Sequence, residues 1–236
     1  MNINDLPEVI LDEMLMEMAF YISPTMKKIL DNIPKVTRKE FINRAQPCDI
    51  IVAFSPKKSL SSVPLKFLAK IVATFQGSPY TSSKVVLDKE DVGGYGIKST
   101  KGLGDSKLQI VPIKQAMNDR VESCLIRLPD LTDGQKKKII SYIRKRKGML
   151  YSSGDLFKTV WNRATNRKAL NFMNDRSMDT KEIKKAFVPL FCSTIISTIF
   201  YALKKIKFNN SNPYDTWPKD FVLDDRTEKI CKIDYT

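Results

Sequence analysis

The stretch Phe187-Val-Pro-Leu-Phe-Cys192-Ser-Thr-Ile-Ile-Ser-Thr-Ile-Phe-Tyr-Ala-Leu203 decides the fold, and it continues into Lys204-Lys-Ile206. Its apolar residues recur at the three- and four-residue spacing of an α-helix that packs one face on a core. They are Cys192, Ile195, Ile196, Ile199, Phe200, Leu203 and Ile206. Pro189 stands just upstream, where a helix can begin but cannot already be running. The pattern predicts a buried helix with Cys192 in its first turn.

This pattern leaves two interpretations of Cys192 open. The free N–H groups and the dipole at the start of a helix favour a thiolate, which would suit a nucleophile. Free cysteine is also among the most buried residue types, so Cys192 can equally be one more small core residue. The hydroxyl residues of the helix share another face, and they are Ser193, Thr194, Ser197 and Thr198. Periodicity alone favours the core interpretation.

Length, charge and cysteine content limit the classes of protein to which this chain can belong. The 236 residues suit one large domain, or one domain with an appendage. Forty basic residues against 26 acidic ones give a net charge of +14, which predicts attraction to a polyanion such as nucleic acid or an anionic cell-wall polymer. The 4 cysteines are widely spaced, so neither a zinc site nor a disulfide framework is indicated. A reducing compartment is the simpler expectation.

Histidine is absent from the whole sequence. Every mechanism that needs an imidazole base is therefore excluded, and so is most zinc chemistry. We expect no metal and no other cofactor.

The N-terminus carries no basic segment ahead of an apolar run, so no signal peptide is expected. Residues 186–203 carry no charge and reach the lower length limit of a membrane span. Pro189 and the clustered hydroxyls favour a core helix over a span. The expected location is the cytoplasm or a virion.

Residues 1–46 are predicted to form a helical extension to a domain that spans residues 47–236. Residues 5–22 have helical spacing, Ser23-Pro24 breaks that helix, and a second helix is expected over residues 25–32. The methionine-rich surface of the first helix is adaptable. It either covers its own domain or docks a protein partner, and both interpretations stay open.

Within the domain, short apolar runs predict strands at residues 50–54, 84–87, 108–112 and 122–128. A basic amphipathic helix is expected over residues 64–75. Residues 93–96 and 101–104 are predicted to be glycine-rich loops, and the second lacks the ending of a phosphate-binding loop. Little regular structure is expected over residues 213–221.

A strongly basic helix is predicted over residues 134–147, capped by Thr132 or Asp133 and ended by Gly148. Three isoleucines at positions 139, 140 and 143 form its buried side. Its basic residues are Lys136, Lys137, Lys138, Arg144, Lys145, Arg146 and Lys147. Such a run is usually a solvated helix face, and the alternative is a contact surface for nucleic acid or another polyanion.

Five segments together carry a family resemblance. They are Pro47-Cys-Asp-Ile-Ile51, Ser78-Pro-Tyr-Thr-Ser-Ser-Lys-Val-Val-Leu-Asp88, Tyr95-Gly-Ile-Lys98, Gly148-Met-Leu-Tyr151 and Phe191-Cys-Ser193. In order and spacing they resemble the circularly permuted papain-like cysteine peptidases of the bacterial cell-wall endopeptidase superfamily. The family reads Gly-Asp-Ile-Ile, Ser-Pro-Tyr-Thr-His-Val-Ser-Ile-Ala-Leu-Asp, Phe-Gly-Arg-Lys, Gly-x-x-Tyr and Tyr/Phe-Cys-Ser at these places. The matches run from about residue 47 to about residue 222.

The resemblance implies an α+β fold, in which an antiparallel sheet packs against a central helix that carries Cys192. It also makes Cys192 the position of the nucleophile and Ser82 the position of the catalytic histidine. A serine hydroxyl cannot hold the proton of a thiol at neutral pH. No orienting carboxylate is evident in the segment after the expected histidine strand. Lys84 lies on the same side of the strand as Ser82 and is the substitute base that the sequence offers.

The sequence therefore predicts a catalytically degenerate papain-like domain that acts as a structural or binding module. The Lys-, Asn- and Ile-rich composition suits a bacteriophage virion component. Two alternatives stay open. One is an active cysteine hydrolase, an endopeptidase or amidase, acting on cell-wall peptides. The other is a basic nucleic-acid-associated protein that also uses Arg163, Arg167 and Lys168.

Overall fold

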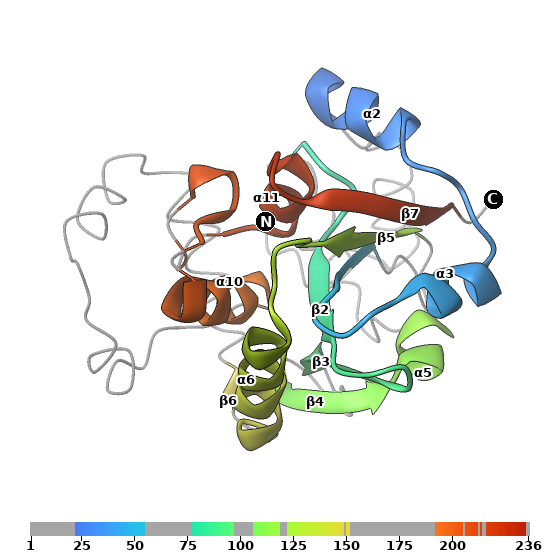
Figure 1. The fold of residues 1–236 in the computed structure, drawn as a ribbon. Helices are drawn as coiled ribbons and strands as arrows, with labels where there is room; N and C mark the ends of the chain where they lie inside the picture. The colour runs from blue at the N-terminus through green and yellow to red at the C-terminus, as the bar shows by residue number, and fades with distance from the viewer. Residues whose placement is uncertain are drawn as a thin grey trace, which may run out of the picture.

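The computed structural model describes residues 22–54, 77–96, 106–118, 122–148, 150–151, 192–204, 206–211, 213 and 216–234. These residues form a mixed α+β fold around one antiparallel sheet with the strand order β6-β4-β3-β2-β1-β5-β7 (Figure 1). The strands are β1 Ile50–Phe54, β2 Ser82–Val86, β3 Asp91–Gly96, β4 Ser106–Pro112, β5 Glu122–Arg127, β6 Leu150–Tyr151 and β7 Glu228–Asp234.

Helices cover both faces of this sheet. In Figure 1, α6 and α10 lie on one side of the strands, and α3 and α5 lie on the other. The helices are α2 Pro24–Asp31, α3 Arg38–Arg44, α5 Ile113–Asn118, α6 Asp133–Lys145, α10 Cys192–Lys204 and α11 Pro218–Leu223, and η2 Phe208–Asn210 is a short 3-10 helix.

Strand β1 shows why two layers of helices are needed. Ile50 and Val52 point into the core formed with α6 and α10, whereas Ile51 points into the core formed with α3 and α5. Successive side chains of a strand alternate between faces, so a continuous apolar run must be buried on both sides. The apolar run of β1 therefore places this strand in the middle of the sheet, between β2 and β5.

The edge strand β7 is covered by the chain before α3. The backbone N–H of Val36 donates to the Lys232 carbonyl at 3.0 Å, and the N–H of Lys232 donates to the Pro34 carbonyl at 2.9 Å. These bonds occupy edge groups that could otherwise pair with another chain.

The N-terminal helices belong to the same two cores as the sheet. Met26 and Leu30 of α2 belong to the core on the α10 side of the sheet, where α2 contacts α11, and Phe41 of α3 is fully buried with α5 on the opposite face. Residues 24–45 of the predicted extension thus supply core side chains to the domain. The predicted helix over residues 5–22 lies outside the described residues.

The predicted strands at residues 50–54, 84–87, 108–112 and 122–128 are confirmed as β1, β2, β4 and β5. Two expectations are wrong: residues 93–96 lie in β3 rather than a loop, and residues 218–223 form α11. The sequence analysis did not predict α5 or β7. The predicted helix over residues 64–75 and loop over residues 101–104 lie outside the described residues.

Gly93 explains the error at β3. A Cβ atom built on Gly93 would lie 2.6 Å from Cγ2 of Ile143 in α6, closer than real side chains approach. This glycine therefore serves close packing of α6 on the sheet rather than a turn. In the sequence, a glycine needed for a turn and a glycine needed for close packing look the same.

A buried ion pair joins three elements of the fold. Asp49, just before β1, is 1% exposed and lies against Arg127 at the end of β5, with Nε–Oδ1 and Nη2–Oδ2 distances of 2.8 Å. Arg127 also donates to the Arg44 carbonyl of α3 at 2.9 Å. Burial raises the pKa of Asp49, and its hydrogen bonds with Arg127 and the Gln46 N–H oppose that shift.

Among the described residues, no helix combines the length and the apolar character that crossing a membrane requires.

We expect Gly93→Ala to destabilise the protein by about 1–3 kcal/mol, because the new methyl group overlaps Ile143 and pushes α6 off the sheet. Urea unfolding measures the change. Gly134→Ala is the matched control, since a Cβ there meets no atom within 4 Å and helix propensity favours alanine by up to about 1 kcal/mol. Equal stability of the two variants would contradict the packing role of Gly93.

We expect Arg127→Met to cost about 3–5 kcal/mol, because it leaves the Asp49 carboxylate buried without its partner. The control is Arg144→Met, which breaks the ion pair with Asp88 at 2.6 Å. Both groups of that pair are nearly half exposed, so the cost should stay below about 1 kcal/mol. Equal losses in denaturant unfolding would show that the Asp49–Arg127 pair does not fasten the sheet to α3.

Candidate functional site

Cys192 is the first described residue of helix α10. Residues 152–191 lie outside the described ranges, so its position in the first turn stays a prediction. Cys192 is partly exposed, whereas every residue from Ser193 to Phe200 is buried. Ile195, Ile196, Ile199 and Phe200 pack in the core against the sheet, where β2 is the strand that contacts α10. Cys192 thus sits where a buried helix reaches the surface.

The hydroxyl face of α10 is buried as well. Ser197 Oγ lies 2.7 Å from the Thr216 hydroxyl, and the Thr198 hydroxyl donates to the Thr194 carbonyl within the helix. Thr194 Oγ1 has no hydrogen-bond partner among the described residues. The core packs against one side of α10, and the segment with Thr216 packs against the other. Helix α10 is therefore buried on both sides and does not expose one face to solvent as an amphipathic surface helix does.

Ser82, the position that the resemblance gives to the histidine, lies on the face of β2 that points away from α10. It pairs with Ala53 in the neighbouring strand, and its Oγ donates to the Ala53 carbonyl at 3.1 Å. Alternation puts Ser82 on the side of Val86, which packs with α3 and α5. Ser83 instead shares the face of Val85 toward α10.

Ser83 is 1% exposed, and its Oγ has no hydrogen-bond partner among the described residues. It is the β2 hydroxyl on the same side of the sheet as the Cys192 helix. The sequence did not single it out, because the strand register that separates Ser82 from Ser83 depends on pairing with Ala53 and Val52.

Lys84 shares the face of Ser82, as predicted, and so points away from α10. It is 7% exposed, and its Cγ would lie 2.7 Å from a Cβ built on Gly94. Gly94 therefore makes room for the Lys84 stem across the β2–β3 pair. This position gives Lys84 a packing role on the α3–α5 face rather than a place beside Cys192.

The other cysteines are core residues. Burial raises the pKa of Cys48 and of Cys124 to about 12 each, and that of Cys231 to about 11. All four thiols are free. No group of three metal-ligating side chains occurs within the described ranges. Cys192 is thus the most accessible thiol of the chain.

The basic helix predicted at residues 134–147 is confirmed as α6, and its cap is Thr132. The Thr132 hydroxyl accepts from the Gln135 N–H at 3.4 Å, and Gln135 Oε1 accepts from the Thr132 N–H at 2.9 Å. Ile139 and Ile143 are buried beneath the helix. The exposed basic residues are Lys137, Lys138, Arg144, Lys145 and Lys147.

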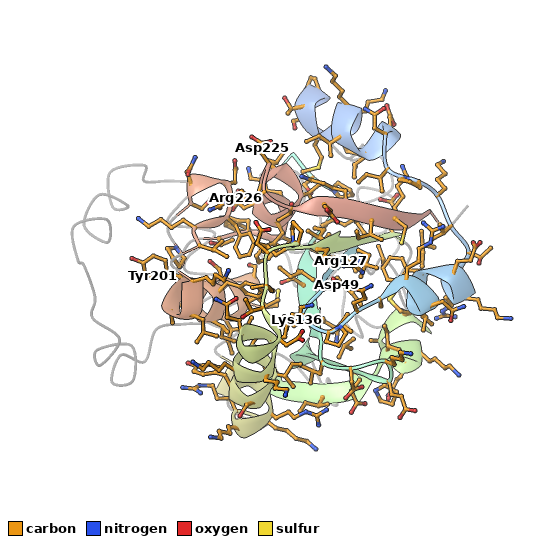
Figure 2. All side chains as sticks on the ribbon, viewed as in Figure 1. Asp49, Arg127, Lys136, Tyr201, Asp225 and Arg226 are labelled. Carbon is orange, nitrogen blue, oxygen red and sulfur yellow. The ribbon has the colours of Figure 1, made fainter. Side chains whose placement is uncertain are left out.

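The structure separates two predicted basic residues from this exposed set. Lys136 is partly buried, and its carbonyl accepts from the Cys48 thiol at 3.6 Å. Burial raises the pKa of Asp49, and the charge of Lys136 opposes that rise (Figure 2). The Arg146 guanidinium lies 3.4 Å from the centroid of the Tyr142 ring. Cation–π contact holds Arg146 against its own helix.

A polar network near the C-terminus was not predicted. Asp224 is 3% exposed and accepts from the Asn209 N–H at 2.6 Å and the Arg226 N–H at 2.9 Å. Burial opposes its ionisation, but hydrogen bonds led by Arg226 outweigh that cost and lower the pKa of Asp224. Burial raises the pKa of Asp220, which accepts from the Trp217 N–H at 2.7 Å. The carboxylates of Asp220 and Asp224 connect α11 to Asn209 of η2, so their role is structural.

No protein-family model matches this sequence, and no curated protein is detectably similar to it. The resemblance to permuted papain-like peptidases therefore stays a prediction. The residues Arg163, Arg167 and Lys168 lie outside the described ranges.

We expect iodoacetamide to modify Cys192 first in the native protein, because the other thiols are buried and their pKa values are raised. Peptide mapping by mass spectrometry locates the adduct, and Cys192→Ser should remove it. In denaturant, all four cysteines should react. Native modification of Cys48, Cys124 or Cys231 at the rate of Cys192 would contradict this packing.

Proposed function

We propose that this chain is a catalytically degenerate papain-like domain that works as a structural or binding module. The observation that carries the proposal is the absence of histidine from a protein whose partly exposed cysteine begins a buried helix. The position suits a nucleophile, because the helix terminus favours a thiolate. The sequence supplies no imidazole, the proton acceptor that a thiol peptidase uses.

Two features of β2 support the proposal that the domain lacks cysteine-peptidase activity. The hydroxyl of Ser83 is on the α10 side, and a hydroxyl does not take a proton from a thiol near neutral pH. The side chain of Lys84 leaves β2 on the opposite side, with its Cβ and Cγ against Gly94. A general base must come within hydrogen-bond reach of the proton that it removes, and neither residue supplies one.

The packing of α10 supports a structural role. The helix is buried on its apolar face by the sheet and joined on its hydroxyl face to Thr216. Such a helix holds its surface end in a fixed position, which lowers the entropy lost when a partner binds. A rigid platform of this kind can present a surface without turning over a substrate.

Two partner expectations remain predictions. The first is that the N-terminal helices dock another protein, and residues 5–22 lie outside the described residues. The second is that the chain is a bacteriophage virion component. Purification of the full chain with its partners would test both.

We expect no hydrolysis when the purified protein is incubated with peptidoglycan fragments, because the chain has no imidazole to take the proton of Cys192. Chromatography with mass spectrometry would detect released peptides, and an active wall endopeptidase is the positive control. Cys192→Ala should give the same result as the unmodified chain. Products that form with the unmodified chain and vanish with Cys192→Ala would establish a cysteine hydrolase and refute the proposal.

A further inference from the structure

The outward face of α6 carries a cationic stripe, which we define as Lys137, Lys138, Arg144 and Lys145. All four side chains are exposed. The two pairs are seven residues apart, so they lie on the same side of the helix, about 10 Å apart along its axis. No Asp or Glu occurs from residue 134 to residue 147. A solvated helix face normally mixes both signs of charge.

Helix stability accounts for only half of this stripe. Cations near the C-terminal end of a helix interact favourably with its dipole, which explains Arg144 and Lys145. Lys137 and Lys138 lie in the second turn, where the dipole effect has faded and does not stabilise them. Exposed charges that helix stability does not explain point to an interaction outside the helix.

The neighbouring charges leave most of the stripe available. Asp88 holds Arg144 at 2.6 Å, and both groups are nearly half exposed. Lys136 and Arg146 are turned toward the protein, at Asp49 and Tyr142 respectively. The helix itself is fixed by its capping box, by buried Ile139 and Ile143, and by close packing on Gly93.

This geometry suits the phosphates of a nucleic-acid duplex. The spacing of the two pairs is close to the width of the B-DNA major groove, about 12 Å, so each pair can contact one bordering strand. Single strands are usually bound by stacking bases on exposed aromatic rings. The one aromatic residue of α6, Tyr142, is partly buried and covered by Arg146.

We propose that the cationic stripe of α6 binds the phosphate backbone of double-stranded DNA without sequence preference. This rests on the proposed function as a binding module and names its partner. Lys137, Lys138 and Lys145 each contact a phosphate, and Lys147 extends the positive surface beyond the helix. Base edges are not contacted, so affinity depends on salt and not on sequence.

The test measures fluorescence anisotropy of a labelled mixed-sequence duplex over a series of salt concentrations. We expect the triple variant Lys137→Gln, Lys138→Gln, Lys145→Gln to reduce the slope of log affinity against log salt by about 2.7, or about 0.9 for each lost phosphate contact. The control is Lys27→Gln, Lys28→Gln, Lys39→Gln, which removes the same charge from exposed lysines on α2 and α3. The control should keep the original slope.

Three outcomes would overturn the proposal. Equal loss of slope in the two triple variants would assign binding to net charge alone. Absence of duplex binding at about 50 mM salt would remove the interaction altogether. Tighter binding to single strands or to poly(glycerol phosphate) than to the duplex would assign the stripe to another polyanion.

Two separate assays of the unmodified chain, peptidoglycan hydrolysis and duplex binding, distinguish this proposal from the proposed function. Peptidoglycan hydrolysis by the unmodified chain would refute the degenerate-domain proposal and leave the DNA result standing. Absence of duplex binding by the unmodified chain would refute the role of the stripe and leave the degenerate-domain proposal standing. Circular dichroism of both triple variants checks that the surface changes leave the fold intact.

Discussion

Two-sided burial of β1 is the constraint on which the rest of the structure depends. Ile50 and Val52 require one apolar layer and Ile51 requires another, so helices must cover both faces of the sheet. The first layer is α10 with α6, and the second is α3 with α5. The Asp49–Arg127 pair then locks the start of β1 to the end of β5 and to α3.

The position of Cys192 follows from this arrangement. The first apolar layer holds α10 against β2, and Cys192, the first described residue of this helix, is partly exposed. The same sheet register sends Ser82 and Lys84 to the other layer and leaves Ser83 and Val85 under α10. The described residues of β2 that face α10 thus supply hydroxyl and apolar groups.

Much of the fold could be predicted from local patterns, because apolar runs and helix caps are written in adjacent residues. The strands around Ile51 and Leu125 and the Thr132 cap of α6 belong to this class. Gly93 was predicted to lie in a loop, whereas it allows close packing against Ile143. Ile143 is fifty residues away, so the local pattern does not show this contact. Ser82 was expected beside Cys192, but its face depends on which residue of β1 it pairs with. Such register is a tertiary property that periodicity does not encode.

The most direct test of the central claim compares two thiol reagents by intact mass. Iodoacetamide needs only an accessible thiol, whereas a peptidyl vinyl sulfone needs a thiol peptidase with a working base and a formed substrate cleft. The account predicts an iodoacetamide adduct and no vinyl sulfone adduct on the native protein under the same conditions. A vinyl sulfone adduct that forms faster than the iodoacetamide adduct, and is lost in Cys192→Ala, would contradict it.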